Sequence, residues 1–263
     1  MQGGVVINDS AVPDDKKTDG ADNIVIEMQH IKKAFGTKVV LADVSMKLKK
    51  GENLVVLGRS GSGKSVAIKC IVRLLDTDGG SLKVFDKEVQ DLSDEQLKDL
   101  RVRVGFLFQS GALYDSMTVG ENLAFPLIRV LKLKDTAEIE KRVADVLTSV
   151  GLLEAIDKMP SDLSGGMRKR IGLARTLILN PEIILYDEPT TGLDPITSQE
   201  ISELMLSLQK KYQTSAIIIT HDMACAKITA DRILVLDEGK FVAEGSYDEL
   251  QNSKDESVRA FFK

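Results

Sequence analysis

The sequence has 263 residues and a formal net charge of −5, and 43% of its residues are hydrophobic while 29% are charged. These fractions are ordinary for a globular protein of one or two domains with a full-sized core, and they exclude coiled-coil and collagen-like chains. The slight acidity argues against a general nucleic-acid-binding protein, and the sequence contains no run of 18 apolar residues that would predict a membrane-spanning helix.

The N-terminal quarter of the chain predicts a tail, strands and one helix. Residues 1–23 are polar and rich in Asp and Gly, so we expect a flexible tail there. From Ile24, IVIEMQHIKKAF alternates loosely as a strand does. VSMKLKKGENLVVLG then predicts a strand, a Lys-Gly turn and a fully apolar strand that enters a glycine loop. Apolar residues at helical spacing between Ile68 and Leu75 predict a helix, which DTDGG is expected to end.

The middle of the chain interrupts this alternation of strands and helices. The segment from Ser93 to about Val150 is mostly charged and helical in pattern, with the strand-like piece VGFLFQ at 104–109. We therefore expect an inserted helical lobe at about residues 112–165. Alternation resumes with EIILYD, a helix over about 196–211, SAIIIT, a short helix, and RILVLDEGKFVAEG, which predicts two strands joined by an Asp-Glu-Gly turn. This pattern predicts an α/β fold with a mainly parallel sheet covered on both faces.

The two cysteines, Cys70 and Cys225, lie far apart in the sequence and match no metal-binding spacing. Each has apolar neighbours. We expect buried, reduced thiols, as is usual for a cytosolic protein.

A glycine-rich loop carries the first functional motif. GRSGSGKS at 58–65 fits G-x-x-x-x-G-K-[ST], in which backbone N–H groups surround phosphate oxygens and the following helix adds its positive N-terminus. Lys64 would reach the β- and γ-phosphates, and the Ser65 hydroxyl would bind Mg²⁺. The alternative is a chance glycine turn, but the motif follows an apolar strand and opens a helix, as phosphate binding requires. The predicted phosphate-loop residues are Gly58, Arg59, Ser60, Gly61, Ser62, Gly63, Lys64, Ser65 and Val66.

Two carboxylates end the apolar strand IILY at 183–186. In parallel sheets, ligands bind at the carboxyl ends of the strands. Asp187 would hold Mg²⁺ through water, and Glu188 is placed to polarise an attacking water. A solvated acidic turn is the alternative, but the glycine loop in the same chain favours the catalytic interpretation.

The segment LSGGMRKR at 163–170 predicts a second helix start with free backbone donors. Ser164 is a good N-cap, and Gly165 and Gly166 leave N–H groups bare. This would be a second anion-binding helix end in a chain with one phosphate loop. The alternatives are an ordinary capped helix with a solvated basic face, and a nucleic-acid patch, which the short cluster and the acidic chain disfavour.

The order of glycine loop, Gln109, LSGG, ILYDEP, Leu193-Asp194 and His221 resembles the nucleotide-binding subunit of ABC transporters, over residues 24–250. The resemblance implies a P-loop NTPase core of ABC ATPase type with an inserted α-helical lobe and an antiparallel β element. Residues 251–263 resemble the short C-terminal ending of the family. ATP and Mg²⁺ are the implied ligands.

The resemblance also explains the second anion site. In the family, two chains pair head to tail, so that Ser164, Gly165 and Gly166 of one chain serve the ATP held by the other. A second copy of this chain is therefore an implied partner. The family pattern usually has Gln where Met167 stands and Thr where Val66 stands, and neither change removes a phosphate or metal ligand.

Four further residues receive roles from the resemblance. Gln109 matches the loop that contacts Mg²⁺ and the water, His221 the switch residue on the γ-phosphate, Asp194 a loop across the dimer interface, and Phe35 the aromatic that stacks on adenine. Without the family, Phe35 would be a core residue and His221 a surface histidine. Gln109 would be a polar strand end, and Asp194 a helix cap, a role that it can combine with the other.

The segments GRSGSGKSV, QSGALYDSMTV and LSGGMRKRIGLAR narrow the resemblance to the ATPase of MCE-type phospholipid transporters, the maintenance-of-lipid-asymmetry (Mla) systems. This implies a homodimer on two copies of an integral-membrane permease, which is linked to MCE-domain substrate-binding proteins. The chain would lie on the cytosolic face of a bacterial inner membrane, since its start has neither a secretory signal nor a transit-peptide composition. No nucleic-acid partner is expected.

Two other functions are compatible with an ABC cassette. One is an ATP-gated regulator of a membrane complex without cargo, as in the cell-division system, which the sequence after Gln109 disfavours. The other is an ATPase that acts on ribosomes or DNA. Such proteins carry two cassettes or long coiled-coil insertions, whereas this chain has one continuous cassette.

Overall fold

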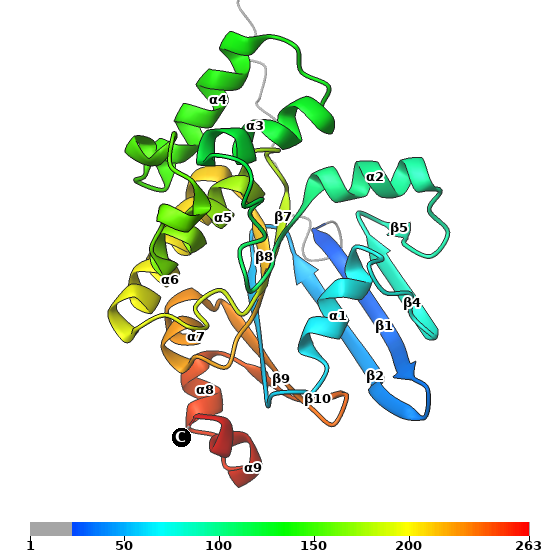
Figure 1. Cartoon of the computed structure of the whole chain (residues 1–263). Coiled ribbons are helices and arrows are strands. Elements are labelled where there is room, and N and C mark those ends of the chain that lie inside the picture. Colours follow the sequence, from blue (N-terminus) through cyan, green and yellow to red (C-terminus); the bar gives the residue numbers. More distant parts are fainter. Residues whose placement is uncertain (1–22, 263) are drawn as a thin grey trace, which may run out of the picture.

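The computed structural model describes residues 23–262, which form a ten-stranded sheet with helices on both faces (Figure 1). A tail was predicted for residues 1–23, of which residues 1–22 lie outside the described part of the chain. The sheet order is β5-β4-β1-β2-β10-β9-β3-β8-β7-β6. The strands are β1 (Ile24–Phe35), β2 (Lys38–Lys49), β3 (Asn53–Gly58), β4 (Gly79–Val84), β5 (Lys87–Glu88), β6 (Val104–Leu107), β7 (Ile183–Asp187), β8 (Ser215–Ile219), β9 (Arg232–Asp237) and β10 (Lys240–Gly245).

The helices alternate with these strands through most of the chain. They are α1 (Lys64–Ile71), α2 (Asp94–Arg103), α3 (Val119–Arg129), α4 (Thr136–Ser149), α5 (Gly165–Leu177), α6 (Pro195–Tyr212), α7 (Met223–Thr229), α8 (Tyr247–Gln251) and α9 (Glu256–Arg259). Short 3-10 helices span Leu153–Ala155, Pro160–Asp162 and Ala260–Phe262. Within residues 23–262, no helix combines the length and the apolar character needed to cross a membrane.

The sheet has a parallel half and an antiparallel half. Strands β9, β3, β8, β7 and β6 pair in parallel, and β3, β7 and β8 are buried along their whole length because helices cover both faces. Strands β5, β4, β1 and β2 are antiparallel, as is β10 against β9. The antiparallel β element that the family resemblance implied is therefore confirmed, whereas the strand–helix pattern, which predicted a mainly parallel sheet, does not describe this second half. The hairpins there bury one face only, so their residues alternate between buried and exposed.

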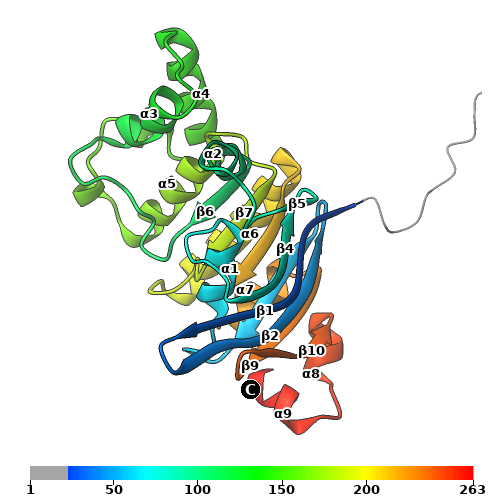
Figure 2. The same ribbon diagram turned by 90° about the vertical axis from the view of Figure 1, so that its right-hand side faces the viewer.

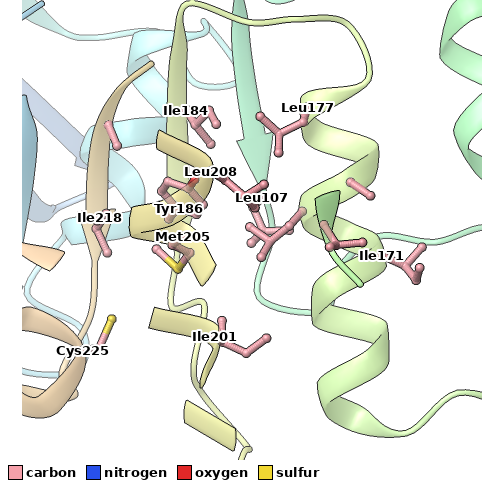
Figure 3. Packing of buried hydrophobic residues seen from close by; sticks show 14 of the residues in the cluster. Leu107, Ile171, Leu177, Ile184, Tyr186, Ile201, Met205, Leu208, Ile218 and Cys225 are labelled. Carbon is pink, nitrogen blue, oxygen red and sulfur yellow. The ribbon is translucent and has the colours of Figure 1, made fainter. Parts of the chain in front are cut away.

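Side chains of alternate residues in the central strands belong to two different hydrophobic cores. One core contains Leu54 and Val56 of β3 and packs against α1 and α2, and the other contains Val55 and Leu57 and packs against α3 to α7. Figure 3 shows the second core, where the buried Tyr186 of β7 lies among side chains of β6, α5 and α6. This packing fixes the carboxyl ends of β3 and β7, where both predicted motifs begin.

Both cysteines are free and buried, as expected. Burial raises the pKa of each thiol to about 11, so both are protonated at neutral pH. Cys70 belongs to α1 and Cys225 to α7, and each serves as a small hydrophobic side chain in its core.

The helices α3 and α4 project away from the sheet, as both views show (Figures 1 and 2). The strand-like piece VGFLFQ contributes β6, which pairs with β7 at the sheet edge, so the projecting helices begin only after this strand. The lobe boundaries of about 112–165 remain a prediction. Helix α5, which carries the LSGG segment at its start, packs between the projecting helices and the sheet.

The sequence pattern did not predict the hairpin of β4 and β5. Helix α1 ends at Ile71, earlier than the predicted Leu75, and the glycines of DTDGG begin β4 instead of only ending a helix. Gly80 has a φ of 91°, and a Cβ atom there would lie 2.5 Å from the carbonyl oxygens of Gln29 and His30. The glycine is needed because β1 passes this close.

Candidate functional site

The glycine loop connects the end of β3 to the start of α1, as predicted. Gly61 and Gly63 have φ values of 81° and 103°, which are strained for other residues. A Cβ atom on Gly58 would lie 2.4 Å from the carbonyl oxygen of Leu236 in the neighbouring strand. The loop is therefore pressed against the sheet, with the N-terminus of α1 facing the space above it, which favours an anion.

Lys64 is held beneath this loop. Its Nζ donates hydrogen bonds to the carbonyl oxygens of Gly58 at 2.7 Å and Arg59 at 3.0 Å, and it lies 4.0 Å from Oε1 of Glu188. Burial lowers the pKa of Lys64, while the charges of Glu188 and Asp187 act in the opposite direction. The amino group is thus positioned by main-chain oxygens within the loop that would bind phosphate.

Ser65 and Asp187 come together from separate motifs. The Ser65 Oγ donates to Oδ1 of Asp187 at 2.6 Å, which joins the start of α1 to the end of β7. A hydroxyl and a carboxylate are the oxygen ligands that Mg²⁺ uses beside substrate phosphates. The Ser62 Oγ, buried in the loop, has no hydrogen-bond partner among residues 23–262. A buried, unpartnered hydroxyl in the same glycine loop fits a site that accepts nucleotide phosphates and their metal.

Glu188 occupies a strained backbone position. Its φ is 53°, a conformation that costs a non-glycine residue roughly 1–3 kcal/mol and that occurs often at functional sites. Its N–H donates to the carbonyl oxygen of Ile219, at 2.9 Å. Its Oε2 accepts hydrogen bonds from the Thr191 hydroxyl at 3.1 Å and lies 2.7 Å from Nδ1 of His221. The carboxylate is thereby aimed between Lys64 and His221.

Two predicted residues do not join this cluster. Gln109 lies in the loop after β6, where its main-chain oxygen accepts a hydrogen bond from the Lys169 amino group, and its side chain makes no hydrogen bond among residues 23–262. Phe35 ends β1 and is 48% exposed, with the Lys33 Nζ 5.6 Å from its ring centroid. A core role for Phe35 is therefore wrong, and its exposed ring is free to stack. Val66 lies in the first turn of α1 and packs partly against the core.

The LSGG segment lies at a different surface. Ser164 caps α5 by accepting the N–H of Met167 at 3.2 Å, as predicted. Asp194 caps α6 by accepting the N–H of Ile196 and of Thr197. Both caps line one hollow together with Gly165 and Gly166, and none of the glycine-loop residues lines it. One chain therefore presents two separate helix starts, one at the glycine loop and one at LSGG, and anion binding at both stays a prediction.

Two residues that contact the site, Thr191 and Lys169, were not predicted from the sequence. Thr191 follows the strand end by a few residues, and threonine after ILYDEP gave no distinct signal. Lys169 belongs to the basic run after LSGG, for which a solvated face was one of the alternatives, yet Lys169 is buried. Its spacing from Gly172 and Leu173, which share its helix face and are also buried, is the pattern that could have identified it.

The fold and this site define an ATP-binding cassette of the P-loop class. A glycine loop, a strand-end Asp-Glu pair, a histidine in contact with that pair and a second helix start occur together in residues 58–221. The comparison with known families agrees, because residues 41–191 match the ABC transporter family. The chain belongs to this family and is an ABC-type ATPase.

Several relatives cover nearly the whole cassette. The methionine import ATP-binding protein MetN of Campylobacter jejuni is 37% identical over 241 residues, which are 86% of this chain and 72% of that protein. The chloroplast protein TRIGALACTOSYLDIACYLGLYCEROL 3 of Arabidopsis thaliana is 38% identical over 256 residues, 91% of this chain and 73% of that protein. A dimeric post-hydrolysis structure of the ATP-binding cassette MJ0796 with ADP and phosphate superimposes with a TM-score of 0.76 at 30% identity, covering 84% of this chain and 98% of that one.

Proposed function

We propose that this chain powers a membrane transporter as a homodimer in which each ATP is bound between the glycine loop of one copy and the LSGG helix of the other. The observation that carries this proposal is the separation, within one chain, of the helix start at the glycine loop from the helix start at LSGG. The catalytic residues surround the glycine loop, whereas Ser164 and Asp194 line a hollow that no loop residue reaches. A related cassette has been solved as a dimer, which supports the arrangement.

The residues of the site have distinct parts in hydrolysis. The loop N–H groups and Lys64 would bind the phosphates, and Ser65 and Asp187 would hold Mg²⁺, which neutralises phosphate charge when bound. Glu188 would accept a proton from the attacking water as the water oxygen bonds to the γ-phosphorus and the bond to ADP breaks, giving ADP and phosphate. His221 would keep the carboxylate of Glu188 oriented through its Nδ1 contact.

The proposed cargo is phospholipid, moved between the membranes of a bacterial envelope. Support comes from the sequence after Gln109, which resembles MCE-type transporters, and from the Arabidopsis relative, whose name contains that of a galactolipid. The Campylobacter relative is named for methionine, so family membership alone does not assign the cargo. The lipid itself would be handled by the permease and its MCE-domain protein.

A hollow beside the Gln109 loop is the proposed contact surface for the permease. Phe106 and Phe108 line it together with Arg175 of α5 and Pro126 of α3. The hollow thus adjoins the sheet edge, the helical lobe and α5, the helix that begins at the LSGG segment and is called the signature helix below. A membrane protein bound there would hold this chain on the cytosolic face of the membrane. Closure of the two cassettes would then move the bound membrane protein.

Affinity purification from native membranes in mild detergent tests the assignment. Recovery of a permease together with an MCE-domain protein is the expected result. Recovery of a division-type membrane protein would replace the transport function by the regulatory one. Recovery of ribosomal or DNA-bound proteins without a membrane protein would overturn both membrane functions, while the ATPase chemistry would remain.

The Lys64→Ala variant should lose ATP affinity. ATP at a thousandfold excess over its Kd should stabilise the wild-type chain by about 4 kcal/mol, because only the folded state binds it. At the same ATP concentration the variant should gain much less, which thermal unfolding with and without ATP would measure. Lys98→Ala is the matched control, since Lys98 is exposed on α2. An equal ATP-induced shift in Lys64→Ala and wild type would contradict phosphate binding by this lysine.

A further inference from the structure

The buried amino group of Lys169 connects the signature helix to the catalytic carboxylate, and no role described above uses it. Lys169 lies on α5, one turn after the LSGG segment, and only 6% of its surface is exposed. Its Nζ donates to the carbonyl oxygen of Gln109 at 2.5 Å and to that of Glu188 at 3.3 Å. One side chain therefore joins α5, the Gln109 loop and the end of β7.

The surroundings explain how a buried lysine is tolerated there. A charge removed from water is costly unless it is paired and hydrogen-bonded. Burial lowers the pKa of Lys169, and the charges of Glu188 and Asp187 oppose this effect. The two carbonyl oxygens take two of its three N–H donors. An apolar residue would fit the space at lower cost, so the position is specified by the groups that the amine binds.

The contact controls the strained residue of the site. Glu188 donates its N–H to the carbonyl oxygen of Ile219 in β8, and its own carbonyl oxygen accepts from the Lys169 amino group and from the Thr191 N–H, each at 3.3 Å. Both peptide groups that flank its φ of 53° are thus held from outside. Without the Lys169 bond, only the Thr191 N–H of the same turn would hold this carbonyl oxygen. The peptide after Glu188 would then be less restrained, and the carboxylate would be free to turn away from Lys64 and His221.

We propose that Lys169 is a positioning residue for ATP hydrolysis, which holds Glu188 and the Gln109 loop in a fixed relation to the signature helix of the same chain. It does not touch the nucleotide and acts through Glu188, so the proposal rests on the role of Glu188 proposed above. Because α5 starts at Ser164, the same lysine makes the catalytic geometry of one site depend on the position of the helix that serves the other site.

Steady-state kinetics of Lys169→Met and Lys169→Gln test this role. Methionine keeps the length without a donor, so kcat should fall by up to about 100-fold, as for other misplaced catalytic groups, while KM and the Kd for ATP stay unchanged. Glutamine has an amide with two N–H donors and should recover part of kcat. Lys141→Met is the matched control, since Lys141 is exposed on α4 and its side chain makes no hydrogen bond or ion pair among residues 23–262.

Several outcomes would overturn the proposal. One is a kcat of Lys169→Met equal to that of Lys141→Met. Another is a loss of kcat in Lys169→Met that is equally large in Lys169→Gln and is accompanied by a lower melting temperature. That result would mean that the lysine has only a structural role. If Lys169→Met does not fold, then Lys169→Gln and Lys169→Arg decide, because both keep donors and should retain more activity than the neutral, donor-free Lys169→Leu measured in the same assay.

Glu188→Gln separates failure of this proposal from failure of the proposed function. Full turnover in Glu188→Gln would remove the catalytic role on which both depend. Loss of turnover in Glu188→Gln together with wild-type kinetics in Lys169→Met would leave the function in place and would overturn the role of Lys169 alone.

Discussion

Exchange of Glu188 for glutamine is expected to lower the rate of ATP hydrolysis by a factor of about 10² to 10⁴, the range for loss of a general base. An amide of the same shape cannot take the proton from the attacking water. ATP should still bind, because the phosphate loop, Lys64 and Ser65 are untouched. Removal of a negative charge 4.0 Å from the Lys64 Nζ should even favour an anion at the loop.

The measurement combines turnover with binding. Phosphate release under saturating ATP gives kcat, and equilibrium binding of labelled ATP gives the Kd for the same preparation. The bound dimer should accumulate, which light scattering after gel filtration with ATP would show. Glu140→Gln on the exposed side of α4 is the matched control and should keep wild-type turnover. A kcat of Glu188→Gln within a few-fold of this control would mean that another group accepts the proton.

The central part of the site could be predicted from local patterns. An apolar strand, a glycine turn and a helix place Lys64 and Ser65, and an apolar strand that ends in two carboxylates places Asp187. Parallel strands bring these ends to one edge of the sheet, and the Ser65 to Asp187 hydrogen bond at 2.6 Å confirms that expectation. The caps by Ser164 and Asp194 were also predictable, because capping depends on a few neighbouring residues.

The remaining features depend on contacts between distant segments. Lys169 belongs to a run of basic residues, and its burial follows from how α5 faces the ends of β6 and β7. The left-handed backbone of Glu188 is held by the local Thr191 N–H and by the distant Ile219 and Lys169, and no local pattern encodes the two distant contacts. The β4 and β5 hairpin could not be predicted from the sequence because glycines usually indicate a turn. Only the proximity of β1 makes Gly80 part of a strand.

Dimers built from two differently defective chains should recover activity if the sites are shared. One chain carries Lys64→Ala, which disables its loop. The other carries Ser164→Asp, which keeps the N-cap of α5 but places a negative charge where the partner's phosphate would lie. A heterodimer of these two chains retains one intact loop facing one intact LSGG helix. It should hydrolyse ATP at about half the wild-type rate if the two sites work independently, since symmetry makes them equivalent.

The reciprocal heterodimer makes this result decisive. Here both substitutions are placed on one chain, and its partner is wild type. If sites are shared between chains, each site then contains one defective half, and this heterodimer should be inactive. If each chain used its own loop and its own LSGG helix, the order would be reversed: the wild-type chain would keep its site, and the dimer with one defect per chain would be inactive. Two affinity tags isolate each heterodimer, so the pair of rates distinguishes the two arrangements whatever the stability of the individual variants.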